Sequence, residues 1–194
     1  MNKEKIILVG GGGHCKSCID VIEQEEKFEI IGIVDVNDKI GEDVLNYKII
    51  GDDDDLPYLV KEYNNFIITI GQLSSPDIRI KLFNIIKELG GQFPVIISPN
   101  AYVSRHSKLH EGTIVMHNAI INAGAVVGIN CIINSKALIE HDAEIGDHCH
   151  ISTASVVNGG VKIGNGTFYG SGAVSKQYII IPEYSFIKAN SIVK

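Results

Sequence analysis

Residues 115–163 read VMHNAIINAGAVVGINCIINSKALIEHDAEIGDHCHISTASVVNGGVKI, and an aliphatic residue returns at every sixth position. The series is Val115, Ile121, Val127, Ile133, Ile139, Ile145, Ile151, Val157 and Ile163, and it extends back to Val103 and Leu109 and forward to Ile181, Ile187 and Val193. Only Tyr169 and Ser175 interrupt it. Neither a helix, with a period of about 3.6, nor an alternating strand, with a period of about 2, sustains this rhythm. The spacing predicts a β-helix of hexapeptide repeats, whose short strands each point one aliphatic side chain inward.

A mostly small residue lies two positions before each aliphatic one. These residues are Ala101, Ser107, Thr113, Ala119, Ala125, Cys131, Ala137, Ala143, Cys149 and Ser155. Small side chains suit the places where a solenoid turns a corner. Because Cys131 and Cys149 occupy this slot, we expect them to be buried and to behave as small apolar residues, not as nucleophiles.

The first part of the chain lacks this rhythm and alternates strand-like with helix-like segments. Apolar runs at 5–10, 28–35, 66–71 and 92–98 predict strands, and helical spacing at 14–26 and 75–91 predicts helices. This alternation is typical of βαβ units and a parallel, Rossmann-like sheet. Ser98-Pro99-Asn100 marks the change of pattern. We predict an α/β nucleotide-sugar-binding domain over residues 1–97 and a β-helix domain over residues 98–194.

Composition excludes several classes of function. The formal net charge of -6 argues against a nucleic-acid partner, because phosphate binding needs a basic surface. No apolar run approaches the roughly 18 residues of a membrane span, and the IILV run near the start is too short for a secretion signal. We therefore expect a cytoplasmic protein without membrane insertion. Cys15 and Cys18 form a lone C-x-x-C, which we interpret as two small residues in the first turn of a helix, with a redox pair as the alternative.

A glycine run, Gly10 to Gly13, followed by His14, lies between a predicted strand and a predicted helix. Backbone amides at such a place bind phosphate, and Asp35 ends the second strand, where an acidic residue meets a ribose or base edge. Cys15 stands where the dinucleotide fingerprint has its third glycine. We interpret the domain as holding a nucleotide-linked substrate and not NAD, with a tight turn that binds nothing as the alternative. The acidic run 52–55 reads as a helix cap without function.

His141 is the candidate general base. With about eighteen residues per coil, Ala123 and Gly159 lie one coil below and above it, and such small neighbours leave room for a substrate and a cofactor arm. Histidine suits general-base chemistry near neutral pH. Asp142 or Glu140 could orient the imidazole, and the sequence does not decide between them.

The other histidines differ in kind. His150 precedes the inward Ile151 and is expected between Ile132 and Phe168, so packing is a real alternative to function. We expect solvated turn positions for His106, His110, His117 and His148. No two of His110, His117, His141 and His150 are one coil apart, so no metal site is predicted.

The whole chain resembles the NeuD/PglD-type sugar O- and N-acetyltransferases, which are hexapeptide-repeat acyltransferases. The resemblance rests on VGGGGH at 9–14, IVD at 33–35, ITIGQ at 68–72, ISPNAYVS at 97–104, INSKALIEHDAEIGDHCHIS at 133–152 and NGGVKIG at 158–164. The last two segments are the specific ones. The resemblance implies a left-handed, three-sided β-helix, a homotrimer with active sites between neighbouring chains, and acetyl-CoA as co-substrate without a permanently bound cofactor.

The resemblance also implies roles for individual residues. His141 matches the catalytic base, Asp142 its acidic partner and Asn134 a substrate contact. Acetyl-CoA binding is implied for His150, Gly159, Ser171 and Asn190, and nucleotide-sugar binding for Gly12, Gly13, His14, Asp35, Gly71 and Gln72. The sequence departs from the family at 187–190, where IKAN replaces a glycine-rich stretch, and the G-x-P-A-K tail is absent.

Our leading hypothesis is an acetyl-CoA-dependent N-acetyltransferase that acts on a UDP- or dTDP-linked 4-amino-4,6-dideoxy sugar in bacterial glycan biosynthesis. Sialic acid O-acetylation is the alternative among enzymes, and a non-catalytic trimeric nucleotide-sugar-binding scaffold is the alternative outside them. An NAD-dependent oxidoreductase is disfavoured by Cys15 and by the lack of a second nucleotide-binding half.

Overall fold

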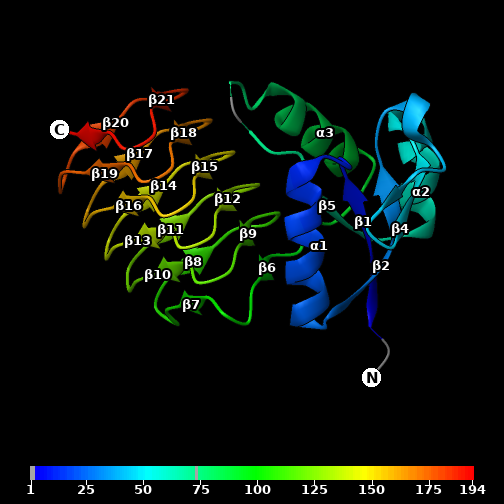
Figure 1. Ribbon diagram of the computed structural model, residues 1–194, viewed down its shortest axis with the longest axis horizontal. Helices are drawn as coiled ribbons and strands as arrows, with labels where there is room; N and C mark the ends of the chain where they lie inside the picture. Colours follow the sequence, from blue (N-terminus) through cyan, green and yellow to red (C-terminus); the bar gives the residue numbers. More distant parts are fainter. Residues whose placement is uncertain (1–2, 73) are drawn as a thin grey trace. The chain divides into compact units, whose positions relative to one another are not determined.

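The computed structural model describes residues 3–72 and 74–194 and divides into two compact units, both drawn in Figure 1. The first unit runs to Gly71 and resumes at Ile78–Pro94, and the second comprises Gln72–Asp77 and Val95–Lys194. The β-helix unit therefore begins slightly before the expected boundary at residue 98 and also includes a short segment from the N-terminal half of the sequence.

A mixed sheet with the order β3-β4-β2-β1-β5 forms the centre of the first unit. Its strands are β1 (Glu4–Val9), β2 (Phe28–Val34), β3 (Asp43–Val44), β4 (Tyr47–Gly51) and β5 (Asn65–Ile68). All neighbours are parallel except the edge strand β3, which runs antiparallel to β4. Ile6, Ile7 and Leu8 of β1, which lies between β2 and β5, are completely buried, as expected for a parallel strand covered on both faces. The predicted α/β sheet is confirmed.

The helices are α1 (Gly13–Glu25), α2 (Leu56–Glu62) and α3 (Asp77–Glu88), with short 3-10 turns η1 (Asn37–Lys39) and η2 (Asp53–Asp55). The acidic run is a helix cap, as predicted: Asp52 Oδ1 accepts the Asp54 backbone N–H, and Asp55 Oδ2 accepts that of Asp52. Burial raises the pKa of the Cys15 thiol to about 11 and also raises the pKa of Cys18. Both thiols are buried in α1 and stay protonated, which favours their interpretation as packing residues.

Two features of the N-terminal half differ from the sequence-based expectation. The β3–β4 hairpin was not anticipated, because its strands are short and carry no clear alternation. The predicted strand at 92–98 does not close the first sheet: only Gln92 bridges to Asn65, and β6 (Ile96–Ile97) pairs with β9 of the β-helix instead. Pro94 lacks an N–H, so it separates these two attachments.

The second unit is a parallel β-helix in which three stacked sheets are built from two-residue strands (Figure 1). The first sheet contains β6, β9 (Ile114–Val115), β12 (Ile132–Ile133), β15 (His150–Ile151), β18 (Phe168–Tyr169) and β21 (Phe186–Ile187). The second contains β7 (Tyr102–Val103), β10 (Ile120–Ile121), β13 (Leu138–Ile139), β16 (Val156–Val157), β19 (Val174–Ser175) and β22 (Ile192–Val193). The third contains β8 (Lys108–Leu109), β11 (Val126–Val127), β14 (Glu144–Ile145), β17 (Lys162–Ile163) and β20 (Ile180–Ile181).

Pairing confirms the predicted coil length. Ile121 pairs with Ile139, and Ile133 pairs with Ile151, so equivalent residues are eighteen apart. The inward aliphatic residues and the small residues before them form one buried core. Tyr169, which interrupts the aliphatic series, also points inward, and its hydroxyl donates to the Val156 carbonyl at 3.2 Å. The predicted hexapeptide β-helix is therefore confirmed.

Every corner of the β-helix from Gly112 onward contains one residue with positive φ. These residues are Gly112, Asn118, Gly124, Asn130, Lys136, Asp142, His148, Ala154, Gly160, Gly166, Gly172, Tyr178, Tyr184 and Asn190. The left-handed region favours glycine and asparagine and is tolerated by aspartate and histidine. The period of six therefore applies to the backbone conformation as well as to the core, and it imposes an unusual conformation on Asp142.

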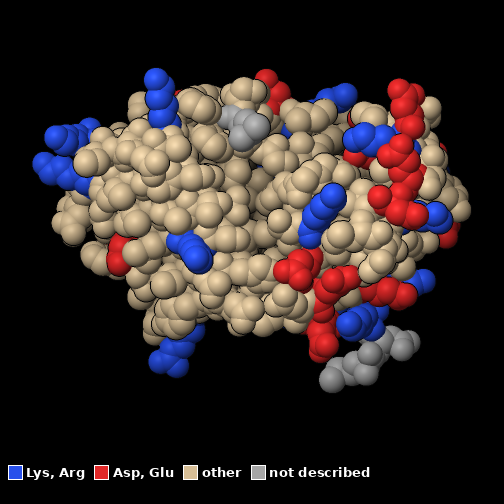
Figure 2. All heavy atoms as spheres, viewed as in Figure 1, with Lys and Arg blue, Asp and Glu red and all other residues tan. Residues whose placement is uncertain are grey.

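No helix in the described ranges 3–72 and 74–194 is long and apolar enough to cross a membrane. Figure 2 shows, on the face drawn, that acidic side chains gather over the first unit, whereas the surface of the β-helix is mostly uncharged.

Candidate functional site

The candidate base His141 lies with Asp142 on the corner between the second and third sheets, just after β13. Its ring Nδ1 is 2.9 Å from Asp142 Oδ2. Glu140 points elsewhere: its Oε2 accepts the backbone N–H of His141 at 3.3 Å and the side-chain amide of Asn122 at 3.0 Å. Asp142 is therefore the carboxylate that orients the imidazole, which answers the question left open by the sequence.

Small residues flank His141 as the coil register predicted. The Gly160 N–H donates to the His141 carbonyl, and the Asp142 N–H donates to the Ala123 carbonyl, so these corners stack directly. A Cβ atom on Gly159 would lie 2.7 Å from Nε2 of His141. Because Asp142 can only accept a proton at Nδ1, Nε2 is left as the basic nitrogen. The His141 side chain is 51% exposed, so a ligand can reach it.

Three further candidates lie on a different corner, between the first and second sheets. Asn134 follows β12, while Ser171 and Asn190 follow β18 and β21. The Asn190 N–H donates to the Ser171 carbonyl at 2.8 Å, and the Ser171 hydroxyl is 2.9 Å from that of Ser152. Within one chain, the structure therefore separates these residues from His141 and Gly159 by the width of the second sheet.

His150 and Gln72 are both buried, with 6% and 1% of their surfaces exposed. As predicted, His150 pairs with Ile132 and Phe168 in the first sheet. The centroids of the His150 and Phe168 rings are 5.2 Å apart, and the rings meet edge to face. Its Nδ1 is 2.9 Å from the Gln72 carbonyl oxygen. The Gln72 side chain donates to the Gly166 carbonyl at 2.9 Å. Gln72 Oε1, in contrast, is buried and has no hydrogen-bond partner among the residues that the structure describes.

The glycine run forms the turn between β1 and α1. Gly10 has a φ of 107°, and Gly12 is the N-cap of α1 without a side-chain cap. The first turn of α1 has no acidic residue, and a Cβ atom on Gly12 or Gly13 would meet nothing within 4 Å. Gly71 lies close to the His14 side chain: a Cβ atom added to Gly71 would lie 3.4 Å from Cβ of His14. The helix N-terminus thus has the electrostatics and the space that a phosphate group needs.

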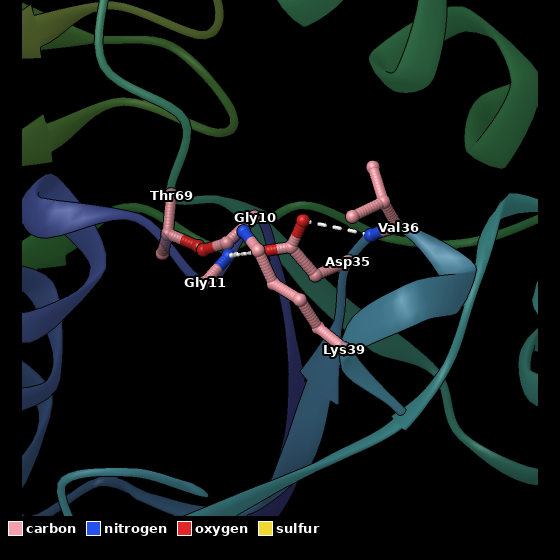
Figure 3. A network of polar contacts seen from close by, with 6 residues as sticks. All are labelled: Gly10, Gly11, Asp35, Val36, Lys39 and Thr69. Atoms are coloured by element: carbon pink, nitrogen blue, oxygen red, sulfur yellow. Dashed lines mark hydrogen bonds and ion pairs between the residues drawn. The ribbon is translucent and has the colours of Figure 1, made fainter. Parts of the chain in front are cut away.

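Asp35 connects the end of β2 to the glycine run, as Figure 3 shows. Its Oδ2 accepts the Gly11 N–H at 2.7 Å and lies 3.2 Å from Lys39 Nζ, and its Oδ1 accepts the Val36 N–H at 2.7 Å. Burial alone would raise the pKa of this carboxyl, but the two backbone N–H groups and Lys39 outweigh burial and hold the pKa below its ordinary value. Asp35 is therefore ionised and shapes the loop.

Sequence reasoning missed two residues that support this loop. The Thr69 hydroxyl donates to the Gly10 carbonyl at 2.6 Å (Figure 3), and the buried Arg79 donates from its guanidinium to the Ile70 carbonyl at 2.6 Å. The sequence offered one weak signal for each residue. Thr69 is a polar residue within an apolar run, and Arg79 is a charged residue within an amphipathic helix. Among the side chains that the structure describes, no group of three His, Cys, Asp or Glu residues is arranged to hold a metal ion.

Comparison with known proteins adds independent evidence. Residues 5–86 match the family model of the PglD N-terminal domain. Comparison with curated proteins finds no match. A mutant of perosamine N-acetyltransferase from Caulobacter crescentus, in complex with CoA and GDP-perosamine, is 30% identical, with 98% of this chain and 88% of that chain covered and a TM-score of 0.91. The acetyltransferase domain of PglB from Neisseria gonorrhoeae, in complex with acetyl coenzyme A, is 26% identical and has a TM-score of 0.90. This match covers 99% of this chain and 93% of that chain.

These matches span both units and agree with the hexapeptide β-helix that the repeats predicted and with the left-handed form that the family resemblance implies. The match to the perosamine N-acetyltransferase covers 98% of this chain, so it extends over the N-terminal sheet and the coils of the β-helix. The chain therefore belongs to the PglD/NeuD-type family of acetyl-CoA-dependent sugar acetyltransferases.

Proposed function

We propose that this chain transfers the acetyl group of acetyl-CoA to the amino group of a nucleotide-linked 4-amino-4,6-dideoxy sugar, in the cytoplasm, for glycan biosynthesis. The observation that carries the proposal is His141, which Asp142 orients from Nδ1 and whose Nε2 faces the space left by Gly159. A relative with this fold is a perosamine N-acetyltransferase in complex with CoA and a GDP-linked sugar.

In the proposed reaction, the sugar amine attacks the thioester carbonyl while His141 Nε2 removes a proton from the amine. The new C–N bond forms, the C–S bond breaks, and the CoA thiolate leaves and takes up a proton. The Asp142 carboxylate stabilises the imidazolium that forms on His141. We expect the backbone N–H of Gly159 to stabilise the oxyanion. No covalent acyl-enzyme is required, which agrees with the burial of Cys131 and Cys149.

We propose that the active site forms between neighbouring chains of a homotrimer. His141 and Gly159 lie on one corner of the β-helix, whereas Asn134, Ser171 and Asn190 lie on another. In a threefold arrangement, one corner of each chain can face a different corner of the next chain. We propose that acetyl-CoA binds along Gly159 of one chain and along Ser171 and Asn190 of its neighbour, with Asn134 close to the acceptor sugar.

On the nucleotide side, we propose that the diphosphate binds at the open N-terminus of α1, on the backbone N–H groups of Gly12 and Gly13. His14 and Gly71 would complete this pocket, with Asp35 holding the loop in place. UDP and dTDP remain our predictions for the nucleotide, and the relative bound to GDP-perosamine makes GDP the third nucleotide to compare.

The proposal is tested by incubating the purified protein with acetyl-CoA and each of several acceptors: UDP-, dTDP- and GDP-linked 4-amino sugars, their 4-hydroxy counterparts, and sialic acid. Release of free thiol measures turnover, and mass spectrometry locates the added acetyl group. N-acetylation of one amino sugar is expected. Transfer to sialic acid alone would favour the O-acetyltransferase alternative. Binding of a nucleotide sugar with no transfer to any acceptor would favour the scaffold.

A further inference from the structure

Tyr178 lies two coils beyond His141 on the same corner of the β-helix. The Gly160 N–H donates to the His141 carbonyl at 3.0 Å, and the Tyr178 N–H donates to the Gly159 carbonyl at 3.1 Å. These two hydrogen bonds stack the corners of successive coils directly on one another. The edge that carries the proposed base therefore continues through Gly160 to Tyr178.

The Tyr178 ring lies across the corner of the preceding coil. A Cβ atom on Gly160 would overlap Cδ1 and Cε1 of Tyr178, so the ring contacts the Gly160 backbone. Tyr178 has a φ of 55°, a conformation that bulky residues rarely adopt, and it is nevertheless 73% exposed. An unusual backbone conformation that holds an aromatic ring at the surface favours a role in function over a role in the core.

Two exposed lysines occupy the same corner in the last coils. Lys176 follows β19 and Lys194 follows β22, and the pairing of Ser175 with Val193 places the two lysines in adjacent coils. Neither lysine has a carboxylate partner among the residues that the structure describes. Both ammonium groups are therefore available to an anionic ligand.

This end of the β-helix is positive although the whole chain is negative. The formal net charge of the chain is -6, yet residues 148–194 contain four lysines and one acidic residue, Glu183. Glu183 lies on a different corner, between the third and first sheets. On the face drawn in Figure 2, Lys and Arg side chains gather at the end of the β-helix where Figure 1 marks the C-terminus. The local charge therefore attracts anions.

The dimensions of CoA fit this arrangement. Its pantetheine arm, which joins the thiol to a phosphorylated ADP, has about the length of four extended residues, or roughly 15 Å. Successive coils are ~4.8 Å apart, so Tyr178 lies about 10 Å and Lys194 about 14 Å along the axis from His141. An arm whose thioester lies at His141 and which runs over Gly159 therefore passes Tyr178 and places its phosphates near the two lysines.

We infer that Tyr178, Lys176 and Lys194 determine the specificity for acetyl-CoA as the acetyl donor. The Tyr178 ring packs along the pantetheine arm, and the two ammonium groups pair with the phosphates of the ADP end. These residues belong to the part of the chain in which IKAN at 187–190 replaces the glycine-rich stretch of the family. The inference rests on the proposed function and adds the residues that select a phosphorylated donor over a short thioester.

Calorimetry with CoA and with pantetheine, which lacks the phosphates, separates the two contributions, and competition against CoA measures the weaker ligand. Lys176→Ala and Lys194→Ala should each weaken CoA binding roughly three- to tenfold at low salt and leave pantetheine binding unchanged. Tyr178→Asn should weaken both ligands by a similar factor, roughly tenfold, because it removes an apolar surface along the arm. Asparagine tolerates the positive φ, so thermal unfolding should not be impaired.

Two variants are matched controls. Tyr184→Asn removes a second exposed tyrosine with positive φ, which lies over Gly166 in the same way but on the corner between the third and first sheets. Arg105→Ala removes a cation that follows β7 on the corner of His141, but on the opposite side of the base along the axis. Both variants should bind CoA as tightly as the wild type does.

Raising the salt concentration should weaken CoA binding in the wild type more than in the Lys176→Ala/Lys194→Ala double variant. Unchanged CoA affinity in the double variant and in Tyr178→Asn, or a loss of affinity in Arg105→Ala instead, would overturn the inference and leave the proposed acetyl transfer intact. An equal loss for CoA and pantetheine in the lysine variants would overturn it too. A wild-type protein that binds no CoA would overturn both this inference and the proposed function.

Discussion

His141 and Asp142 are adjacent in the sequence, yet the imidazole Nδ1 lies 2.9 Å from the carboxylate Oδ2. Neighbouring residues of an extended strand point to opposite faces, so this contact needs a special backbone. Asp142 supplies it with a φ of 59°, the left-handed conformation that recurs at every sixth residue of the β-helix. The repeat that builds the fold therefore also places the acidic partner of the proposed base.

Asp142→Asn should lower kcat by roughly 10- to 100-fold, because the neutral amide no longer stabilises the imidazolium on His141. Asparagine tolerates the positive φ, so the fold should remain intact. Steady-state kinetics and circular dichroism check both points. Glu140→Gln is the matched control and should change kcat little, because the Glu140 carboxylate accepts hydrogen bonds from the His141 backbone N–H and the Asn122 side-chain amide and not from the imidazole ring. A larger defect in the control than in Asp142→Asn would show that the wrong carboxylate has been chosen.

Gly159→Ala should weaken acetyl-CoA binding and turnover while leaving nucleotide-sugar binding unchanged. The new methyl group would lie 2.7 Å from His141 Cε1 and Nε2, so the half-exposed imidazole must move into the space proposed for the cofactor arm. Calorimetry with each substrate separately measures the two effects. Gly13→Ala adds the same methyl group in open space at the N-terminus of α1 and should show the opposite pattern. Equal acetyl-CoA affinity in Gly159→Ala and the wild type would contradict the proposed cofactor position.

Asp35→Asn should remove a pH-dependent part of the stability of the first unit. The folded-state pKa of Asp35 lies below its ordinary value of about 3.9, so its stabilising effect is complete above that value and is lost as the pH falls through the folded-state pKa. The difference in unfolding free energy between wild type and variant should therefore be greatest near neutral pH and shrink on acidification. Urea unfolding across this range measures it.

Asp43→Asn is the control for that experiment. Asp43 pairs with Lys48 at an exposed position, where an ion pair contributes little. Its unfolding curves should follow those of the wild type. Parallel curves for wild type and Asp35→Asn at every pH would mean that Asp35 does not stabilise the loop through its charge.

The site between chains predicts complementation. His141→Ala disables the corner that carries the base, and Ser171→Trp blocks the other corner, so each homotrimer should be nearly inactive. A mixed trimer contains one interface with an intact His141 facing an intact Ser171, and should recover activity. The measurement compares co-expressed, doubly tagged protein with each parent, and light scattering gives the oligomeric state. A monomer in solution, or mixed trimers as inactive as the parents, would contradict a site shared between chains.

The sequence predicted the β-helix well because each position of a solenoid contacts only the coils beside it. A count of eighteen residues was enough to place Gly159 beside His141 and to bury Cys131 and Cys149. It could not connect Gln72 to His150, because those residues are 78 positions apart and no repeat relates them. The choice of Asp142 over Glu140 depended on a positive φ that aspartate adopts only in its structural context. Short strands such as β3 and β6 carried too few residues for a periodic signal.

The central claim is that His141 acts as the general base, and the rate of His141→Ala against pH tests it most directly. Turnover at neutral pH should fall by roughly 10²- to 10⁴-fold, with little change in the affinity for either substrate. Because the sugar amine loses its proton unaided in alkaline solution, the deficit should shrink steadily toward about pH 9. A deficit that stays constant across the pH range, or near-normal turnover at neutral pH, would contradict the account.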